Sequence, residues 1–468
     1  MGRSSPDLTT GPIGKTLILF ALPLLGSNVL QSINGSANAV WVSHILGEAA
    51  LAAISNANQI FFLMLGSMFG LAMAANILIG QAMGARDEAM ARRVVGTCTA
   101  FFIAVSTAVG VLGFTLTPAI LDAMGTPADA RPQAIAYLQV IFSAIPFIYF
   151  FTFMMMAQRG MGDSRTPFLF SIVVVALDIA LNPLLILGVG PLPRLGIAGS
   201  AAATLVAQTV TLAILLTHLY RRNSLLVVRP GDWRVLIPDL TIIRTLVFKG
   251  LPMAFQMMVI SLAAVTMMSL VNGFGSDTAA AYGAAVQIWT YVQMPAMALG
   301  AAVSSIAAQN VGAGKMDRVA EVARKGVLAA FVGTTILVIL LELAEPYVIG
   351  AFLPADSAAR PIAGHINAIV LWGFIPFGMA FIFNGVVRAT GAVWPPLAAM
   401  IIALWVVRVP FATVLLPHLG ADAVWWSFPA GSLVMLALAA AYYRFGGWRK
   451  ARMLPESVQG EAADTGAA

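Results

Sequence analysis

The stretch GEAALAAISNANQI at residues 47–60 returns as GSDTAAAYGAAVQI at residues 275–288, 228 positions further along the chain. This offset pairs Gln59 with Gln287. More pairs occur at offsets of 228 to 230: Pro23 with Pro252, Gln81 with Gln309, Pro146 with Pro376, and Gly162 with Gly391. Because the offset is nearly constant over most of a half, the chain consists of two related halves.

The composition is that of a membrane protein. Hydrophobic residues make up 60% of the 468 residues and charged residues only 10%, against roughly 25% charged residues in soluble domains. The mean hydropathy is +0.89. These values exclude soluble enzymes, disordered chains and collagen. The single cysteine, Cys98, allows no intrachain disulfide.

Apolar stretches long enough to span a bilayer need about 20 residues each. The sequence has twelve, near residues 16–42, 50–80, 94–117, 132–157, 166–189, 196–219, 241–272, 279–308, 326–345, 361–387, 393–416 and 421–445. We therefore predict an all-α membrane protein with twelve transmembrane helices in two six-helix repeats. Since each half has an even number of helices, both enter the membrane in the same direction and the repeats are parallel.

The basic residues predict the orientation. With the N-terminus in the cytoplasm, 22 of the 26 Lys and Arg residues fall in cytoplasmic segments, and three, Arg131, Arg194 and Arg360, fall in outer loops. Positive charge collects on the cytoplasmic side of membrane proteins. We therefore expect both termini in the cytoplasm and a multi-pass protein of the inner (plasma) membrane. The distribution of the basic residues is explained by the membrane orientation of the chain, so we expect no nucleic-acid partner.

One long polar stretch, residues 220–239, lies almost at mid-chain. It predicts a cytoplasmic linker between the halves. The expected organisation is therefore an N-lobe, a linker, a C-lobe and a polar cytoplasmic tail, at residues 1–220, 221–240, 241–450 and 451–468.

Several short motifs occur in a characteristic order: Trp41-Val42-Ser43, Gly80-Gln81-Ala82-Met83-Gly84-Ala85, Arg159-Gly160-Met161-Gly162-Asp163, Leu181-Asn182-Pro183-Leu184-Leu185, and Trp405 to Pro410. With the twelve helices, they resemble the multidrug and toxic compound extrusion (MATE) family, in particular its DinF-like prokaryotic branch. The resemblance covers about residues 12 to 450. It implies V-shaped lobes around a central cavity.

The resemblance also implies a function. Members of the family are secondary active antiporters that export amphipathic, often cationic compounds in exchange for H⁺ or Na⁺. The expected partners are small-molecule drugs or toxic metabolites and the lipid bilayer, and we expect a monomer.

Two other functions remain open. A lipid-linked oligosaccharide flippase of the same superfamily is one, but a polyanionic lipid calls for several basic residues in the cavity, where only Arg408 qualifies. A membrane-embedded enzyme is the more remote one, since the sequence contains no HExxH motif and no Walker A loop. We expect no enzymatic activity and no cofactor.

Asp178 is the one acid near the middle of an apolar helix in the first half. An intramembrane carboxylate is costly and usually faces a cavity, so this group is our candidate for binding the coupling ion. Asn182 lies four residues later on the same helix face. The resemblance adds Asn38, where relatives often carry Asp. The three together are also a candidate Na⁺ site, and structural hydrogen bonding is the alternative for each.

Other residues are candidates for movement and for substrate contact. Pro23 falls early in the first helix, where proline permits a kink, and in the family bending of this helix is linked to substrate release. A static kink is the alternative. Arg408, two residues before Pro410, either lines the cavity or bonds carbonyls that the proline frees. The remaining candidates for the cavity are Met154, Met257, Gln59 and Gln287.

Overall fold

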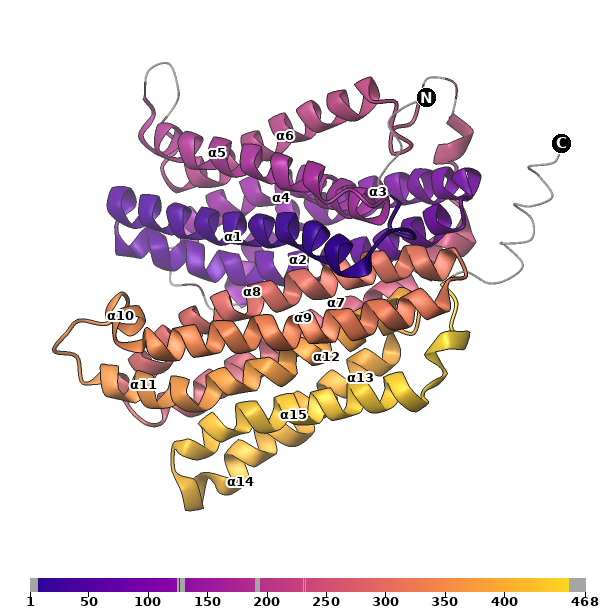
Figure 1. Ribbon diagram of the computed structural model, residues 1–468. Helices are drawn as coiled ribbons and strands as arrows, with labels where there is room; N and C mark the ends of the chain where they lie inside the picture. The colour runs from indigo at the N-terminus through magenta and orange to yellow at the C-terminus, as the bar shows by residue number, and fades with distance from the viewer. Residues whose placement is uncertain are drawn as a thin grey trace. The chain divides into compact units, whose positions relative to one another are not determined.

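The computed structural model describes residues 7–123, 126, 131–189, 194–229, 231 and 233–453, without the side chains of 48–60, 62, 63, 233 and 234. Within these residues the chain is helical and has no strand (Figure 1). The first half contains α1 (Ile13–Leu46), α2 (Glu48–Gly84), α3 (Glu88–Ala123), α4 (Arg131–Gly160), α5 (Arg165–Leu187) and α6 (Ile197–Arg221). A short 3₁₀ turn, η1 (Trp233–Leu236), precedes the second half.

The second half is more interrupted. Its elements are α7 (Leu240–Asn272), α8 (Ser276–Gly312), α9 (Met316–Leu343), α10 (Glu345–Gly350), α11 (Ala359–Val370), η2 (Leu371–Gly373), α12 (Phe374–Ala389), α13 (Trp394–Ile401), η3 (Ile402–Arg408), α14 (Val409–Leu419), α15 (Asp422–Phe445) and η4 (Gly447–Lys450). Twelve segments of the described chain are long and apolar enough to cross a membrane. The predicted number and class of helices are therefore confirmed.

Two predicted single helices are each built from three pieces. The span Ala359–Ala389 has a 3₁₀ turn, η2, between α11 and α12. The span Trp394–Leu419 contains the π-helical segment η3, which ends two residues before Pro410. Proline has no N–H to donate within a helix, so a change of hydrogen-bond register beside it is expected. The short helix α10 was not predicted because its six residues cannot span a bilayer.

The turns after the first helix of each half preserve the duplication. Gly47 precedes α2 with φ of 83°, and Gly275 precedes α8 with φ of 98°. Positive φ values are open to glycine at little cost. The duplicated sequence thus encodes the same sharp turn twice, and both turns begin the stretches that reveal the repeat.

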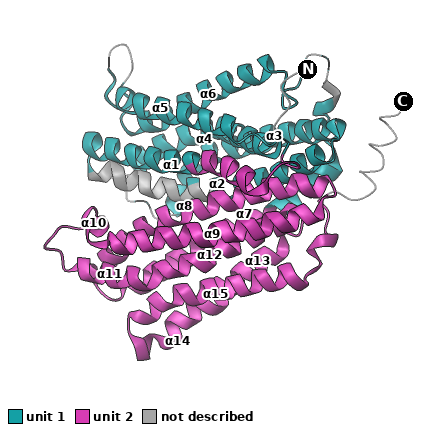
Figure 2. Cartoon of the chain, viewed as in Figure 1, with its two compact units in different colours: residues 1–7, 26–250, 454–468 teal, residues 8–25, 251–453 magenta. Residues whose placement is uncertain are grey.

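The described chain divides into two compact units (Figure 2). Unit 1 includes residues Gly26–Gly250, and unit 2 includes Leu8–Leu25 and Leu251–Met453. The division crosses α1 and α7, close to Pro23 in the first and to Pro252 in the second. The lobe bounds given from sequence stay a prediction.

Unit 1 is held together by close helix contacts. The helix α4 packs against α2, α3 and α6, and α5 packs against α6. A Cβ on Gly113 of α3 would overlap the ring of Phe142 on α4, and one on Gly199 of α6 would overlap the backbone of Leu185 on α5. Small residues let membrane helices approach closely, so Gly113 sets the spacing of α3 and α4, and Gly199 sets that of α5 and α6.

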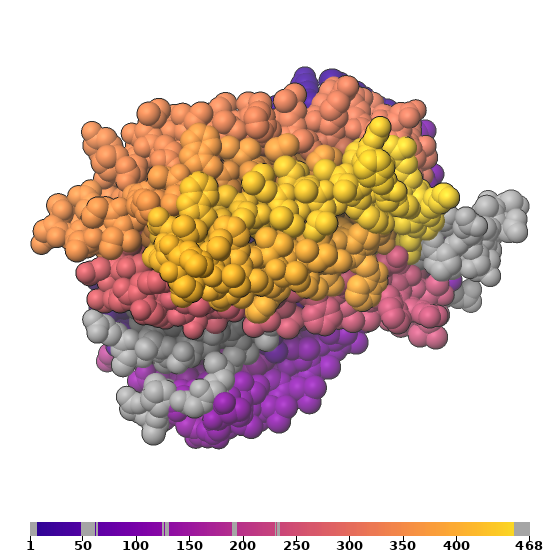
Figure 3. Space-filling model, turned by 90° about the horizontal axis from the view of Figure 1, so that it is seen from below, coloured from indigo at the N-terminus to yellow at the C-terminus, as the bar shows by residue number. Residues whose placement is uncertain are grey.

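Unit 2 has an aromatic interior. Tyr282 and Trp289 of α8 pack with Phe374, Trp425 and Phe428, at ring centroid distances of 4.9 to 6.3 Å. Figure 3 shows one face of the molecule, on which the C-terminal residues of this unit appear in orange to yellow. Large apolar side chains on these helices are exposed, among them Val406, Val414 and Leu433, as is expected where a helix faces lipid.

Candidate functional site

The buried carboxylate of Asp178 lies at a meeting point of three helices of unit 1. It is on α5 and is 1% exposed. From α1, the amide nitrogens of Asn34 and Asn38 donate to its Oδ2 at 2.7 and 3.3 Å. From α6, the hydroxyl of Thr204 donates to its Oδ1 at 3.2 Å. A single carboxylate therefore joins α1 and α6 through α5.

Asn182 extends this arrangement by one helical turn. Its Nδ2 donates to Oδ1 of Asn38 at 2.8 Å and to Oγ of Ser200 at 3.2 Å. The side chain is fully buried. The three residues predicted from sequence, Asp178, Asn182 and Asn38, are thus in direct hydrogen-bond contact, while their role in ion coupling stays a prediction.

Asn34, Ser200 and Thr204 also belong to this arrangement and were not predicted from the sequence. Each helix contributes a pair of polar residues four positions apart: Asn34 and Asn38, Asp178 and Asn182, and Ser200 and Thr204. Residues at this spacing share a helix face. The spacing of polar residues within apolar helices was the signal that could have found them. We call these six residues the acid–amide network.

Two oxygens of the acid–amide network are buried without a hydrogen-bond partner, Oδ1 of Asn34 and Oδ1 of Asn182. Leaving a buried acceptor unpaired is costly. Carboxylate, amide and hydroxyl oxygens are ligands suited to hard cations, and a carboxylate is also a proton acceptor. Among the described residues, no three acidic, histidine or cysteine side chains gather as a metal site would require. Whether the network binds a cation or a proton stays a prediction.

Arg408 lies in unit 2 at the end of η3 and is half-buried. Cζ of its guanidinium lies over the ring of Phe428, 3.2 Å from the ring centroid. Nε of Arg408 is buried and has no hydrogen-bond partner in the described part of the chain. Both interpretations of its role, lining the cavity and bonding carbonyls freed by Pro410, stay predictions. A planar guanidinium stacks favourably on an aromatic face, and this contact holds Arg408 within the aromatic interior.

The other predicted residues are dispersed. Pro23 is inside α1, and Met154 is buried within unit 1. Met257 is half-buried and Gln287 is exposed, both in unit 2. Gln59 falls in the part of α2 whose side chains lie outside the described residues. The assignment of these residues to a substrate cavity stays a prediction.

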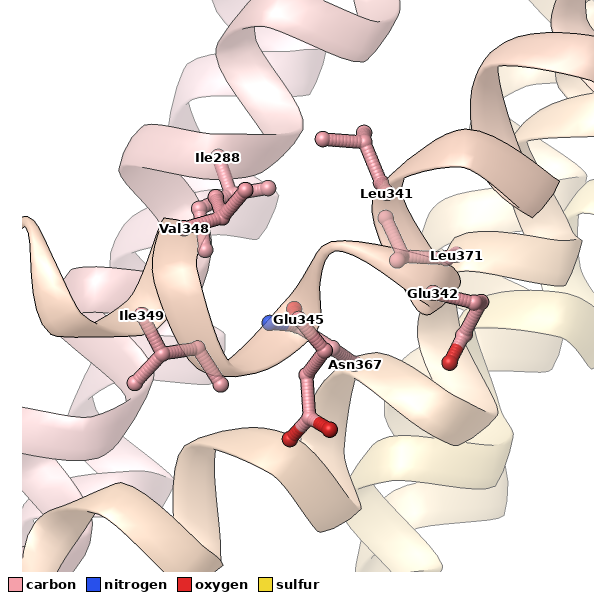
Figure 4. Close-up of a pocket in the computed structure, with 8 residues that line it drawn as sticks. All are labelled: Ile288, Leu341, Glu342, Glu345, Val348, Ile349, Asn367 and Leu371. Atoms are coloured by element: carbon pink, nitrogen blue, oxygen red, sulfur yellow. The ribbon is translucent and has the colours of Figure 1, made fainter.

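A small cavity lies elsewhere in unit 2, among α8 to α11 and η2 (Figure 4). Its lining is mostly aliphatic, with three polar side chains, Glu342, Glu345 and Asn367. The amide oxygen of Asn367 already accepts a hydrogen bond from Nε1 of Trp289 at 2.9 Å. This cavity contains none of the residues predicted for the site.

Comparison with known proteins decides the family. The sequence model of the MatE family matches residues 23–184 and 252–414. The chain belongs to the MATE family. The two matched segments correspond to the two repeats, and the resemblance seen in the sequence motifs is confirmed.

Curated relatives of this MATE transporter match it over nearly its full length. A probable multidrug resistance protein of Bacillus subtilis, YoeA, is 37% identical over 440 residues, which cover 94% of this chain and 95% of the relative. A second B. subtilis protein of the same description, YpnP, is 30% identical and covers 96% and 99% of the two chains.

Solved structures of MATE proteins share the fold. A crystal structure of a MATE protein in the straight conformation superposes with a TM-score of 0.88 at 21% identity, covering 96% of this chain and 100% of that one. A structure in the bent conformation gives 0.87, also at 21% identity, with 95% and 98% covered. The chain is therefore a multi-pass membrane transporter with the MATE fold.

Proposed function

We propose that this transporter is a secondary active multidrug efflux antiporter that exports amphipathic, often cationic compounds in exchange for H⁺ or Na⁺. It acts as a monomer in the plasma membrane, with both termini in the cytoplasm, and it catalyses no chemical reaction. The observation that carries the proposal is the carboxylate of Asp178, buried in an apolar helix and held by donors from α1 and α6. The names of the B. subtilis relatives, which refer to multidrug resistance, support the substrate class.

The coupling step follows from the charge of this carboxylate. When Asp178 is ionised, it accepts hydrogen bonds from Asn34 and Asn38 on α1 and from Thr204 on α6. Binding of a proton or a sodium ion neutralises the carboxylate and changes which hydrogen bonds it can accept from these side chains. Because α1 is attached to α5 through these bonds, ion binding alters the free energy of moving α1. A ligand shifts a conformational equilibrium by its differential affinity for the two states.

The direction of exchange is set by the same site. If ion binding favours the conformation that releases the drug to the outside, the ion moves inward while the drug moves outward. The unpaired oxygens of Asn34 and Asn182 belong to the same network and can add ligands for a sodium ion. Asp178 alone can carry a proton. Sodium binding should therefore depend on the amide oxygens more strongly than proton binding does.

The test is transport of a fluorescent cationic drug in proteoliposomes, with a pH gradient and a Na⁺ gradient imposed separately. We expect one of the two gradients to drive efflux by the wild-type protein. Asp178→Asn keeps the size of the side chain and removes its charge, so gradient-driven transport should fall to the level of empty liposomes. Wild-type rates for this variant under the driving gradient would refute the proposal.

A matched variant controls for the loss of an acidic residue. Asp277 is exposed in the first turn of α8, and Asp277→Asn makes the same chemical change outside the acid–amide network. It should transport at the wild-type rate. Equal losses in both variants would mean that net charge, and not the buried carboxylate, explains the effect.

A further inference from the structure

A second cluster of buried polar side chains lies in unit 2, far along the sequence from the acid–amide network. It consists of Gln256 on α7 and Asn384 and Arg388 on α12, which are 2%, 4% and 6% exposed. Nη1 of Arg388 donates to Oε1 of Gln256 at 3.2 Å. Asn384 and Arg388 are four residues apart and therefore share a face of α12. We call these three residues the donor cluster.

The donor cluster has unused donors. Nε of Arg388, Nε2 of Gln256 and Nδ2 of Asn384 are all buried and have no hydrogen-bond partner. Each of these atoms can only donate. The cluster therefore presents three N–H groups from three side chains, and what it lacks is an acceptor.

The donor cluster also carries an unbalanced charge. Arg388 takes part in no ion pair in the described chain. The surroundings are apolar: the ring of Phe381 lies 5.8 Å from the guanidinium, and Phe381 belongs to a buried apolar cluster against which Val259 and Ile260 of α7 pack. A buried charge is costly unless it is paired. Water can accept hydrogen bonds here, but it cannot supply the opposite charge.

We infer that the donor cluster binds a compact inorganic anion of single charge, such as chloride. One such ion accepts hydrogen bonds from all three side chains and neutralises Arg388. A compact ion is required because Arg388 and Gln256 are in direct contact and all three side chains are more than nine-tenths buried. The ion joins α7, one turn beyond Pro252, to α12 within unit 2 and stabilises their packing.

The repeat offers a matched control. Arg159, in the last turn of α4, pairs with Arg388 at an offset of 229 residues. It is less buried, and its Nη1 contacts the sulfur of Met156 at 3.6 Å. Its neighbour at the position equivalent to Asn384 is Met155, which has no N–H in its side chain to donate. A chloride effect that belongs to the donor cluster should therefore survive Arg159→Gln.

The experiment is thermal unfolding of the purified full-length protein in detergent, with sodium chloride replaced stepwise by sodium gluconate at constant ionic strength. We expect the Tm of the wild type to rise with chloride and to saturate. Arg388→Gln should abolish the rise, and Arg159→Gln should keep it. Asn384→Ala removes one donor and leaves the charge, so the chloride concentration for half the effect should rise roughly tenfold.

Three results would overturn the inference. They are a wild-type Tm that is the same in chloride and gluconate, a full chloride response in Arg388→Gln, and an unchanged half-saturating concentration in Asn384→Ala. The last variant decides the question if Arg388→Gln does not fold. Crystals soaked in bromide provide a direct check, because an anomalous signal must appear beside Arg388. The readout is stability, so failure here leaves the proposed ion coupling at Asp178 untouched.

Discussion

The two units place opposite chemistry at equivalent positions. Asp178 of unit 1 and Arg408 of unit 2 are related by an offset of 230 residues, close to that of the flanking repeats. The glycines before the last helix of each half, Gly196 and Gly420, have similar backbone angles (φ of 57° and 56°). Counted from them, Thr204 corresponds to Phe428. An acid with a hydroxyl partner in one unit thus matches a cation with an aromatic partner in the other.

The difference extends beyond this pair. Asn38 corresponds to Met267 at an offset of 229 residues, and Asn182 corresponds to Ala412 at 230. Met267 and Ala412 are fully buried in the aromatic and aliphatic core of unit 2. The same helical framework therefore tolerates a polar network or an apolar core. Because polar groups within a membrane are expensive and are retained for function, unit 1 is where we expect ion coupling to be concentrated.

The largest effect is expected when unit 1 receives the residue that unit 2 has at the equivalent position. Asp178→Arg places a cation among the N–H groups of Asn34 and Asn38, with Thr204 in place of an aromatic ring. We expect a loss of about 3–5 kcal/mol, the usual effect of an uncompensated buried charge. Thermal unfolding and size-exclusion chromatography in detergent measure it.

The double variant Asp178→Arg with Thr204→Phe tests whether an aromatic partner stabilises the introduced cation. It supplies the ring that Arg408 has in unit 2, so it should recover about 0.5–2 kcal/mol through the cation–π contact. If Asp178→Arg alone is as stable as the wild type, the acid–amide network does not require a carboxylate. The difference between Asp178 and Arg408 then has no effect on the stability of the two units.

A smaller effect is expected when an amide is replaced by its apolar equivalent. Asn38→Met copies Met267 and removes one donor to Asp178 and the acceptor of Asn182. Asn182 keeps its bond to Ser200. Gradient-driven drug efflux in proteoliposomes should slow roughly tenfold, equivalent to about 1.4 kcal/mol. Met267→Leu, a change of similar volume in unit 2, is the control and should leave the rate unchanged.

Much of the fold could be predicted from the sequence, because each membrane span needs a long apolar stretch, and such stretches can be counted directly. All twelve spans were counted this way. The interruptions were harder to predict. The π-helical segment η3 and the turn η2 have the same apolar composition as their neighbours. Their hydrogen-bond register depends on how they pack against α15 and other helices. These tertiary contacts cannot be predicted from a single sequence.

The candidate site was predicted in part. Asp178 stands out because an acid is rare in an apolar helix, whereas Ser200 and Thr204 barely change the hydropathy of α6. Arg388 was counted among the basic residues of a cytoplasmic segment, but the structure places it in the last turn of α12 and nearly buries it. Charge counts report which side of the membrane a residue is on. They do not report whether its side chain has a partner.

The prolines at the division between the units allow a kinetic prediction. Pro23 in α1 leaves the carbonyl four residues earlier without its usual helical donor. Pro23→Ala restores that donor and should stiffen α1, so drug efflux should slow several-fold while drug binding is retained. Pro252→Ala makes the same change in α7, which carries no part of the acid–amide network, and should slow efflux less. Equal loss of binding and transport in Pro23→Ala would indicate a packing role.

The smallest effect is expected at Arg408. Its guanidinium lies over the ring of Phe428, and a Cβ on Gly431 of α15 would come into close contact with Cβ of the arginine. Arg408→Lys keeps the positive charge but loses the planar surface, so the stability should fall by about 0.5–1 kcal/mol. Thermal unfolding in detergent measures this change. The ion dependence of efflux should not change, because in our proposal unit 2 holds this cation for packing and unit 1 performs the coupling. If Arg408→Lys abolished gradient-driven efflux at normal stability, the coupling would have to be shared by both units.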